Sequence, residues 1–429
     1  MIKLFSVEDF LTHANPTKTN SQDKQQFIQA ASEIIAEVQS GGDEAVRKFI
    51  EKFDGEAPDS FLVSEAERTQ AWDKVDQKII TSLEKAAENI KSFHQKQLNN
   101  SRMMQAENGI ISGQLFRPID RVGIYVPGGT ACYPSSVLMN AIPAVLAGVK
   151  EVIMVTPVRN GEEIAPILSV AADIAGVTTI YRVGGAQAIA ALAYGTETIP
   201  AVDKIVGPGN AYVAAAKSLV FGDVGIDMIA GPSEVAIIAD GTANPIFIAA
   251  DLIAQAEHDT NARAFLITTS SEMMKQVQLE LENQCDDLPR QSIAEAALTE
   301  KGAGVVVKTL EEAFQIANKI APEHLEVQVK DPISYLNKVR HAGSVFLGHY
   351  TPEALGDYYA GPNHVLPTSG TARFSSGLSV DDFVKKTTYL YYSETALKEA
   401  SEHVINIANE EQLEGHGRAV SSAWRENNR

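Results

Sequence analysis

The sequence predicts an α/β fold, because short apolar segments alternate with helical segments over two long stretches of the chain. In the first stretch, residues 121–221, strand–helix units follow one another, and glycine separates the strands from the helices. Four such units within about one hundred residues indicate a doubly wound, mostly parallel sheet. A second series of strand and helix patterns begins at Glu234. The residue pattern alone leaves open whether the two regions share one architecture.

Helices are expected to precede the first α/β region. Apolar residues recur at helical spacing between Phe27 and Val38, and Gly41-Gly42 is expected to close that helix. A long, mostly polar helix is expected over 64–98. Within the region itself, the expected strands are 122–126, 152–155, 179–183 and 204–206, and the expected helices are 134–148, 164–175, 186–194 and 211–219.

The second α/β region contains one helix with a clear start. Pro245 suits the first turn of a helix that we expect to run to about Glu257. From Ser379 the chain is polar, and we expect it to be helical to the end. The strands expected in this region are 234–239, 264–268, 304–307 and 343–347.

Composition narrows the classes of partner. The net charge of −19 argues against nucleic acid and against anionic membrane surfaces, because both are bound by basic faces. The 429 residues include only two cysteines, Cys132 and Cys285, which fits a reducing cytoplasm better than a disulfide scaffold. Residues 1–11 lack a secretory pattern, and no segment approaches the ~18 apolar residues of a membrane span. We therefore expect a cytoplasmic protein with neither nucleic acid nor membrane as a partner.

Three glycine-rich loops lie between an expected strand and an expected helix: Pro-Gly-Gly at 127–129, Gly184-Gly185, and Gly-Pro-Gly-Asn at 207–210. At the carboxyl edge of an open α/β sheet, the helix N-termini beside such loops offer free N–H groups to phosphate. Glycine also turns a strand into a helix without any ligand. The G-x-G-x-x-G fingerprint with a later acidic residue is absent. The residues leave both a phosphate-bearing ligand and simple turns open.

Candidate metal ligands are spread over distant segments. Gln255 and His258 are three residues apart on one expected helix, so their side chains share a face. Asp357 and His416 would have to join them from elsewhere in the chain. Nitrogen and oxygen donors without a thiolate are typical of a substrate-accessible zinc site. A solvated Gln or His, and an Asp357 in a turn, are the alternatives that the pattern leaves open.

The adjacent pair Glu323-His324 follows a proline and offers two bases with different intrinsic pKa values. A solvated turn is the alternative interpretation of the same pair. Cys132 lies just after the first glycine loop, where a thiolate could form a thiohemiacetal with an aldehyde. The alternative for Cys132 is a small, buried apolar residue.

Over essentially its full length the chain resembles the histidinol dehydrogenase family. No single segment carries the resemblance, but many occur together and in order. The segments are VGIYVPGG at 122–129, VGGAQA at 183–188, VGPGN at 206–210, AGPSEV at 230–235, QAEHD at 255–259, APEHLE at 321–326, AGSVFLG at 342–348, AGPNHVLPT at 360–368 and TARFSSG at 371–377.

The resemblance implies two doubly wound, Rossmann-like domains of an incomplete dinucleotide-binding type, with helical N- and C-terminal extensions. The implied N-terminal extension is 1–20, and the implied C-terminal extension, 378–429, contributes to the site of a partner subunit. Residues 21–120 with 233–377 would form the α/β domain that carries the metal and catalytic residues, and residues 121–232 the Rossmann-like domain on the NAD side.

The resemblance further implies a zinc-dependent, NAD-linked, four-electron oxidation of L-histidinol, through an aldehyde-level intermediate, to L-histidine. These are the final steps of histidine biosynthesis, with one zinc ion per subunit and two NAD molecules reduced per turnover. The family also implies a homodimer with shared active sites, in which Glu411 and His416 reach the neighbour's site.

By matching position, the resemblance gives the residues these roles. The implied zinc ligands, which also contact substrate, are Gln255, His258, Asp357 and His416. The further substrate contacts are Ser233, His324 and Glu411. The NAD contacts are Tyr125, Gln187 and Asn210, and the acid–base pair is Glu323 and His324.

Two other classes compete with this hypothesis. A metal-dependent hydrolase of a small amine or amide would use the same ligands and Glu323 to activate water, and it would need no nucleotide. A non-catalytic paralogue would have lost a metal ligand or the Glu323-His324 pair, and none of these residues is lost.

Overall fold

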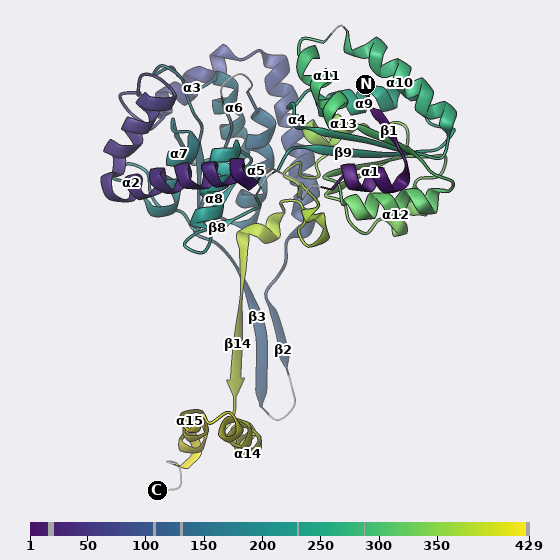
Figure 1. Ribbon diagram of the computed structural model, residues 1–429. Coiled ribbons are helices and arrows are strands. Elements are labelled where there is room, and N and C mark those ends of the chain that lie inside the picture. Colours follow the sequence, from purple (N-terminus) through teal and green to yellow (C-terminus); the bar gives the residue numbers. More distant parts are fainter. Residues whose placement is uncertain (16–20, 106–108, 129–131, 230, 287, 426–429) are drawn as a thin grey trace. The chain divides into compact units, whose positions relative to one another are not determined.

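The computed structural model describes residues 1–15, 21–105, 109–128, 132–229, 231–286 and 288–425 (Figure 1). The chain divides into two compact units, one of residues 1–97 with 120–383 and one of residues 98–119 with 384–429. The larger unit holds two parallel sheets, and the smaller holds an antiparallel sheet with two helices.

The first parallel sheet confirms the four strand–helix units expected between residues 121 and 221. Its strand order is β6-β5-β4-β7-β8, and all pairs are parallel. Helices α2, α7 and α8 share one core with this sheet, and α5 packs with α6. The strands are β4 (Arg121–Tyr125), β5 (Glu151–Val155), β6 (Thr179–Tyr181), β7 (Lys204–Val206) and β8 (Gly225–Ile226), and the helices are α5 (Pro134–Ala147), α6 (Pro166–Ala175), α7 (Gly185–Tyr194) and α8 (Ala211–Val220).

The second parallel sheet has the order β1-β11-β10-β9-β12-β13. When β1 is left out and the strands of each sheet are numbered in chain order, both sheets have the spatial order 3-2-1-4-5. Figure 1 shows α9, α10 and α11 on one face and α1 with α12 on the other, and each face has its own apolar core. The strands are β1 (Lys3–Phe5), β9 (Glu234–Ala239), β10 (Arg263–Thr268), β11 (Ala303–Val306), β12 (His324–Gln328) and β13 (Ser344–Leu347), and the helices are α1 (Val7–His13), α9 (Pro245–Ala256), α10 (Ser271–Cys285), α11 (Gln291–Glu300), α12 (Leu310–Ile320) and α13 (Glu353–Tyr358).

The two sheets thus repeat one doubly wound design, and the α/β, Rossmann-like fold class expected from the sequence is confirmed. Strand order reverses between β4 and β7 in one sheet and between β9 and β12 in the other. A dinucleotide-binding sheet of the Rossmann type has a sixth strand beyond the fifth, and among the described residues neither sheet has that strand. The domain boundaries expected from the sequence remain a prediction.

The N-terminal helices differ from expectation in one place. The helix expected over 64–98 is two helices, α3 (Glu65–Lys74) and α4 (Gln77–His94). Asp76 interrupts them, because its side chain accepts the Lys78 N–H at 2.7 Å and so caps the start of α4. The expected break at Gly41-Gly42 is confirmed: α2 (Ser21–Phe53) leaves helical geometry at Gly42, where φ is 53°.

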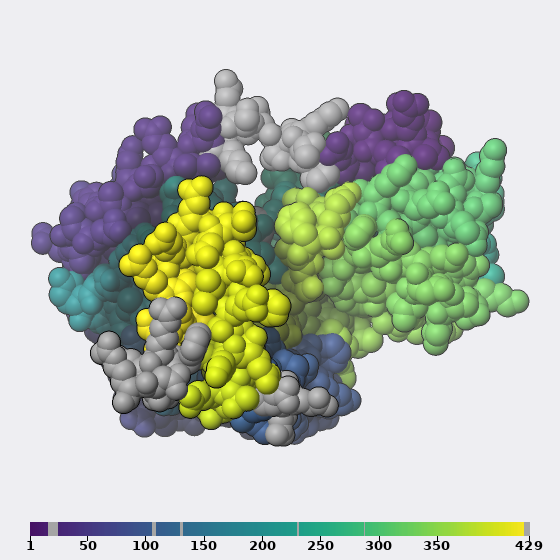
Figure 2. Space-filling model, turned by 90° about the horizontal axis from the view of Figure 1, so that it is seen from below, coloured from purple at the N-terminus to yellow at the C-terminus, as the bar shows by residue number. Residues whose placement is uncertain are grey.

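The smaller unit corrects the expectation that residues from Ser379 onward are helical. β14 (Val384–Tyr392) pairs with β3 (Ile110–Pro118), which pairs with β2 (Arg102–Gln105). The segment 384–392 is rich in β-branched and aromatic residues, which favour strands. Helices follow as α14 (Glu394–Glu410) and α15 (Glu414–Arg425), coloured yellow in Figure 2.

Three other strands were not expected: β1, the two-residue strand β8, and β12. β1 replaces helix at the start of the expected N-terminal extension, and β12 forms where only an exposed turn or a reactive pair was considered. Within the described residues, no helix is long and apolar enough to cross a membrane.

Candidate active site and metal centre

Glu323 and His324 lie at the amino end of β12, between β9 and the edge strand β13 of the second sheet. They are only 7% and 4% exposed, so the solvated-turn interpretation is wrong. β12 pairs with β9, whose first residue is Glu234, and the backbone N–H of Glu234 donates to Glu323 Oε2 at 3.0 Å. Because α9 follows β9 and returns antiparallel to it, the end of α9 brings Gln255 and His258 to this same amino edge.

The tautomer of His324 follows from its neighbours. Its Nδ1 lies 3.1 Å from the carbonyl oxygen of Glu234, which can only accept, so Nδ1 carries the hydrogen. Nε2 is then unprotonated, and it is buried without a hydrogen-bond partner among the described residues. Burial lowers the pKa of His324 to about 3, and the nearby His258 and His364 act in the same direction. His324 is therefore a neutral imidazole whose Nε2 can accept a proton.

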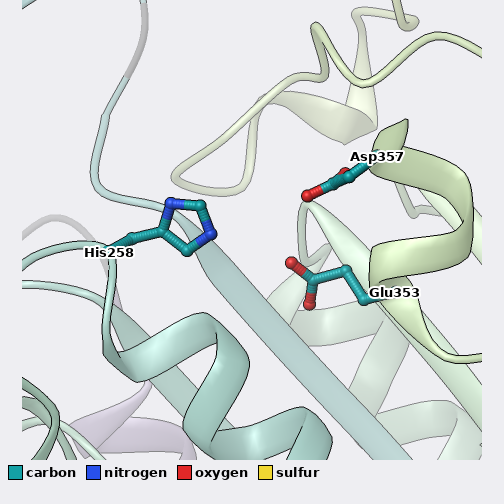
Figure 3. A group of neighbouring side chains, drawn as sticks. All are labelled: His258, Glu353 and Asp357. Atoms are coloured by element: carbon teal, nitrogen blue, oxygen red, sulfur yellow. The ribbon is translucent and has the colours of Figure 1, made fainter. Parts of the chain in front are cut away.

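His258, Glu353 and Asp357 place one donor atom each within 4.8 Å of one another. Figure 3 shows the imidazole from the end of α9 and the two carboxylates from α13 directed toward a common space. Asp357 Oδ1 also lies 3.7 Å from His324 Nε2. Burial raises the pKa of Asp357 to about 7, and a cation in this space would favour its charged form. One imidazole nitrogen and carboxylate oxygens are a donor set that suits zinc.

Gln255 joins this group through its amide. The inner atom of the amide lies 3.2 Å from both carboxylate oxygens of Glu353 and 3.2 Å from the carbonyl oxygen of Glu234. All three of these neighbours accept, and they outnumber the one donor within reach, His324 Nδ1 at 3.1 Å, whose hydrogen goes to the Glu234 carbonyl oxygen. The inner atom is therefore the amide nitrogen, and the amide oxygen faces the opposite side. The structure thus brings together three of the residues proposed from the sequence, Gln255, His258 and Asp357.

Glu353 is the residue that the sequence analysis missed. It is 2% exposed, and burial raises its pKa well above the ordinary value. A signal was present in the sequence: Glu353 and Asp357 are four apart, directly after Pro352, which places two carboxylates on one face of a helix. The helix itself is only six residues long and was not expected, so the spacing was not recognised.

Of the remaining proposed site residues, Ser233 lies at the same amino edge of the sheet, and the other two belong to the smaller unit. Ser233 precedes β9 and is half-buried. Glu411 ends α14, and His416 lies in the first turn of α15; both are exposed residues of the smaller unit. Their contribution to the site remains a prediction. His364, which has no proposed role, hydrogen-bonds the Asp357 carbonyl oxygen through Nδ1 at 3.0 Å, and burial lowers its pKa to about 4.

The three proposed NAD contacts, Tyr125, Gln187 and Asn210, line one cavity of about 810 Å³. It lies at the carboxyl edge of the first sheet, where the strand order reverses, as in other open α/β sheets. Tyr125 ends β4, Asn210 caps α8, and Gln187 lies in the first turn of α7. The Tyr125 hydroxyl accepts the Gly185 N–H at 3.2 Å, and burial raises the pKa of Tyr125 to about 12.

The glycine loops before α7 and α8 have specific structural requirements. Gly207 has φ of 108°, and a Cβ there would collide with the Tyr125 carbonyl oxygen. Its carbonyl oxygen accepts from Lys217 at 2.9 Å, and its N–H donates to Asp227 at 2.8 Å. Lys217 and Asp227 form a buried ion pair, which fixes the loop against the end of β4. In the loop at 127–129, Gly129 lies outside the described residues.

Cys132 lines this same cavity and is exposed, so the buried interpretation is wrong. The surrounding protein raises the pKa of its thiol, which disfavours the thiolate that attack on an aldehyde requires. Cys285 is buried, and both cysteines are free thiols.

Beneath the site lie two buried carboxyl groups, Glu326 and Asp251, which hydrogen-bond to each other. Gln328 Nε2 donates to both, at 2.8 Å to Glu326 and 3.2 Å to Asp251. Burial raises the pKa of both groups, and that of Glu326 well above its ordinary value. The folded protein therefore holds a proton that the unfolded chain releases above roughly pH 4.

We expect Glu326→Gln to gain stability relative to the wild type as the pH rises. Because the wild-type folded state binds more protons than the unfolded state, its stability falls with pH from about pH 4 up to the raised pKa. Each unit by which the pKa is raised corresponds to about 1.4 kcal/mol. Denaturant unfolding of both proteins at pH 5 and pH 8 measures the difference. A difference that is the same at both pH values would show that this pair does not hold the proton.

Comparison with known proteins places the chain in a family. It matches the family model described as Histidinol dehydrogenase over residues 17–423. A histidinol dehydrogenase of Bacillus cereus is 56% identical over 395 residues, which is 92% of each chain, and one of Streptococcus mutans is 54% identical over 388 residues, or 90% of each. The crystal structure of histidinol dehydrogenase from Elizabethkingia anophelis has a TM-score of 0.94 and 38% identity, and the match covers 100% of this chain and 99% of that chain. The chain belongs to the histidinol dehydrogenase family.

Proposed function

We propose that the protein catalyses a zinc-dependent, NAD-linked oxidation of L-histidinol, through an aldehyde-level intermediate, to L-histidine in histidine biosynthesis. One observation carries this proposal. The neutral His324 and the buried Glu323 lie at the same edge of the sheet as three side chains that can bind a metal ion. These side chains are Gln255, His258 and Asp357. Membership of the family gives the reaction class. The two free cysteines fit a cytoplasmic location.

Gln255, His258 and Asp357, with His416 of the partner subunit, would hold one zinc ion per subunit. When bound, zinc supplies a fixed positive charge that orients the substrate and favours ionised oxygen atoms. Ser233 and Glu411 are the further proposed substrate contacts. The donors on this chain come from the end of α9 and from α13, so both helices must pack on the sheet before the site exists.

His324 is the base of the first oxidation. Its Nε2 takes the hydroxyl proton of the alcohol while the Glu234 carbonyl oxygen holds the hydrogen on Nδ1. NAD, when bound, accepts the hydride from the carbon atom in each of the two steps. With its hydroxyl proton and one hydride removed, the alcohol becomes an aldehyde.

Glu323 is the base of the second oxidation. Burial raises the pKa of Glu323 well above its ordinary value, and a cation at the neighbouring donor group would favour its ionised form. The ionised carboxylate accepts a proton from the water that attacks the aldehyde carbon, and the hydrate then loses a second hydride to give the acid. The Glu234 N–H bond to Oε2 holds the carboxylate in place, and its other oxygen remains for the water. Two adjacent residues on one strand can thus act in succession on a substrate that stays bound.

The cavity of Tyr125, Gln187 and Asn210 is the proposed NAD site. Its volume lies within the range of cofactor pockets. Gly184, the N-cap of α7, provides no side-chain cap, so apart from the Gly185 N–H, which donates to Tyr125, the first N–H groups of α7 are available to phosphate. Asn210 uses only its oxygen for capping, with bonds of 3.0 and 3.1 Å from the N–H groups of Tyr212 and Val213. Its amide nitrogen is therefore available to donate to the dinucleotide.

Asn210→Asp is expected to weaken NAD binding about tenfold while leaving stability unchanged. Aspartate caps a helix as well as asparagine does, but it cannot donate and it repels the pyrophosphate. Asn210→Ala is the matched control, and it should lose about 1 kcal/mol of stability as well. Titration of NAD followed by tyrosine or tryptophan fluorescence, together with thermal unfolding, measures both effects. Unchanged NAD affinity in Asn210→Asp would remove this residue from the cofactor site.

We further propose a homodimer in which Glu411 and His416 serve the partner's active site. Both residues are exposed, and the smaller unit also exposes apolar side chains that a partner surface could cover. These exposed apolar residues are Met103, Met104, Leu390 and Tyr391.

The proposed function is tested by NADH formation from L-histidinol and NAD, with and without a chelator. The expected result is activity that chelation abolishes and zinc restores. A metal-dependent hydrolase would form no NADH, and a non-catalytic relative would form none even with zinc bound. Either outcome from the folded, zinc-loaded protein would contradict the proposal.

A further inference from the structure

We infer that Glu353 is a positioning residue of the metal centre, one that orients the amide of Gln255 so that its oxygen faces the cation. The inference rests on the proposed zinc site and adds a residue that is not among its ligands. A glutamine amide has one donating end and one accepting end of nearly equal size, and only the oxygen binds a cation. Without a neighbouring group that favours one orientation of the amide, Gln255 would also turn its nitrogen, which cannot bind the metal, toward the cation.

Glu353 distinguishes them when it is ionised, because a carboxylate accepts at both oxygens and donates at neither. Burial raises the pKa of Glu353, and a cation in the site favours the ionised form. Both oxygens lie 3.2 Å from the inner amide atom of Gln255, and the Glu234 carbonyl oxygen adds a third acceptor at 3.2 Å. The nitrogen of Gln255 is therefore held inward, and its oxygen is turned outward. Carboxylates that orient metal ligands in this way are common around zinc sites.

Glu353 is itself held from three sides. It is the first residue of α13, and its own N–H donates to Glu326 Oε1 at 3.2 Å. Its Oε1 lies 3.6 Å from His324 Nδ1. Gly356, one turn further on, allows α13 to approach β13 closely, since a Cβ there would collide with the ring of Phe346. The carboxylate is thus fixed between the general base and the amide ligand.

Glu353→Gln tests the inference with little change in shape. An amide at position 353 offers a donor as well as an acceptor, so it no longer selects one orientation of Gln255. We expect zinc affinity, measured by competition with a chromophoric chelator, to fall about 10- to 100-fold. The matched control is Glu326→Gln, which changes a buried acid that does not contact Gln255 and keeps an oxygen that can accept the Glu353 N–H. Its zinc affinity should therefore stay near that of the wild type.

A double-mutant cycle then separates positioning from direct binding. If Glu353 acts through Gln255, Glu353→Gln should have little further effect on zinc affinity in a Gln255→Ala background. An equal loss in both backgrounds would overturn the inference, because Glu353 would then act as a ligand or through its charge alone. Wild-type affinity in Glu353→Gln, or an equal loss in Glu326→Gln, would also overturn it. A wild-type protein that binds no zinc would instead refute the proposed metal centre, and the inference with it.

Discussion

Glu323→Gln is expected to slow the oxidation of the aldehyde by about 10²- to 10⁴-fold, and to slow the oxidation of the alcohol far less. Glutamine keeps an oxygen for the Glu234 N–H bond, so the local structure is retained. What it loses is the ability to take a proton from water. The two half-reactions are measured separately, as NADH formed from L-histidinol in the first turnover and NADH formed from added aldehyde.

His324→Gln is the matched control for this prediction. It removes the unprotonated Nε2, and it should slow the alcohol half-reaction by a comparable factor. Glu323→Gln should therefore slow mainly the aldehyde half-reaction, and His324→Gln mainly the alcohol half-reaction. Equal losses in both half-reactions for Glu323→Gln would contradict the division of labour between the two residues.

Two inactive variants are expected to form an active heterodimer if the active site is shared between subunits. His416→Asn and Asp357→Asn should each lose zinc affinity by more than about a hundredfold, since each removes a proposed ligand. In a heterodimer of the two, one site has an intact Asp357 from one subunit and an intact His416 from the other. Co-expression with two different tags isolates this heterodimer, which should have about half the wild-type activity.

The control for the shared site pairs two ligands of the same unit. A heterodimer of Asp357→Asn and His258→Asn leaves each site without one of these two ligands, and it should be inactive. Activity in this control, or none in the pairing of His416→Asn with Asp357→Asn, would contradict the exchange of C-terminal segments between subunits.

The sequence predicted the parts of the fold in which the apolar pattern is regular. The strands of residues 121–221 are buried on both faces and read as short apolar runs, and the helix from Pro245 was expected to end near Glu257, as observed. Pattern alone could not find β12, because this fully buried strand contains His324, Glu326 and Gln328. Because the polar residues of the site are buried within this strand, the strand lacks the apolar pattern by which buried strands are predicted.

The candidate site was predictable only in part, for a similar reason. Gln255 lies in the last turn of α9 and His258 two residues beyond its end, so their proximity follows from a spacing of three residues. Their approach to Asp357 depends on how α9 and α13 pack against the sheet. This packing cannot be predicted from the residue pattern of either helix alone. Glu353 was missed because its role depends on contacts with Gln255 and Glu326 across that packing. Glu411 and His416 depend on a second subunit and stay predictions.

The central claim, two oxidations of one substrate at a zinc-dependent site, is tested most directly by the ratio of products. Limiting L-histidinol is mixed with excess NAD and zinc-loaded protein, and NADH is followed by absorbance to completion. We expect two NADH and one L-histidine for each L-histidinol consumed. One NADH for each L-histidinol, with the aldehyde as the final product, would contradict the second oxidation and the role of Glu323.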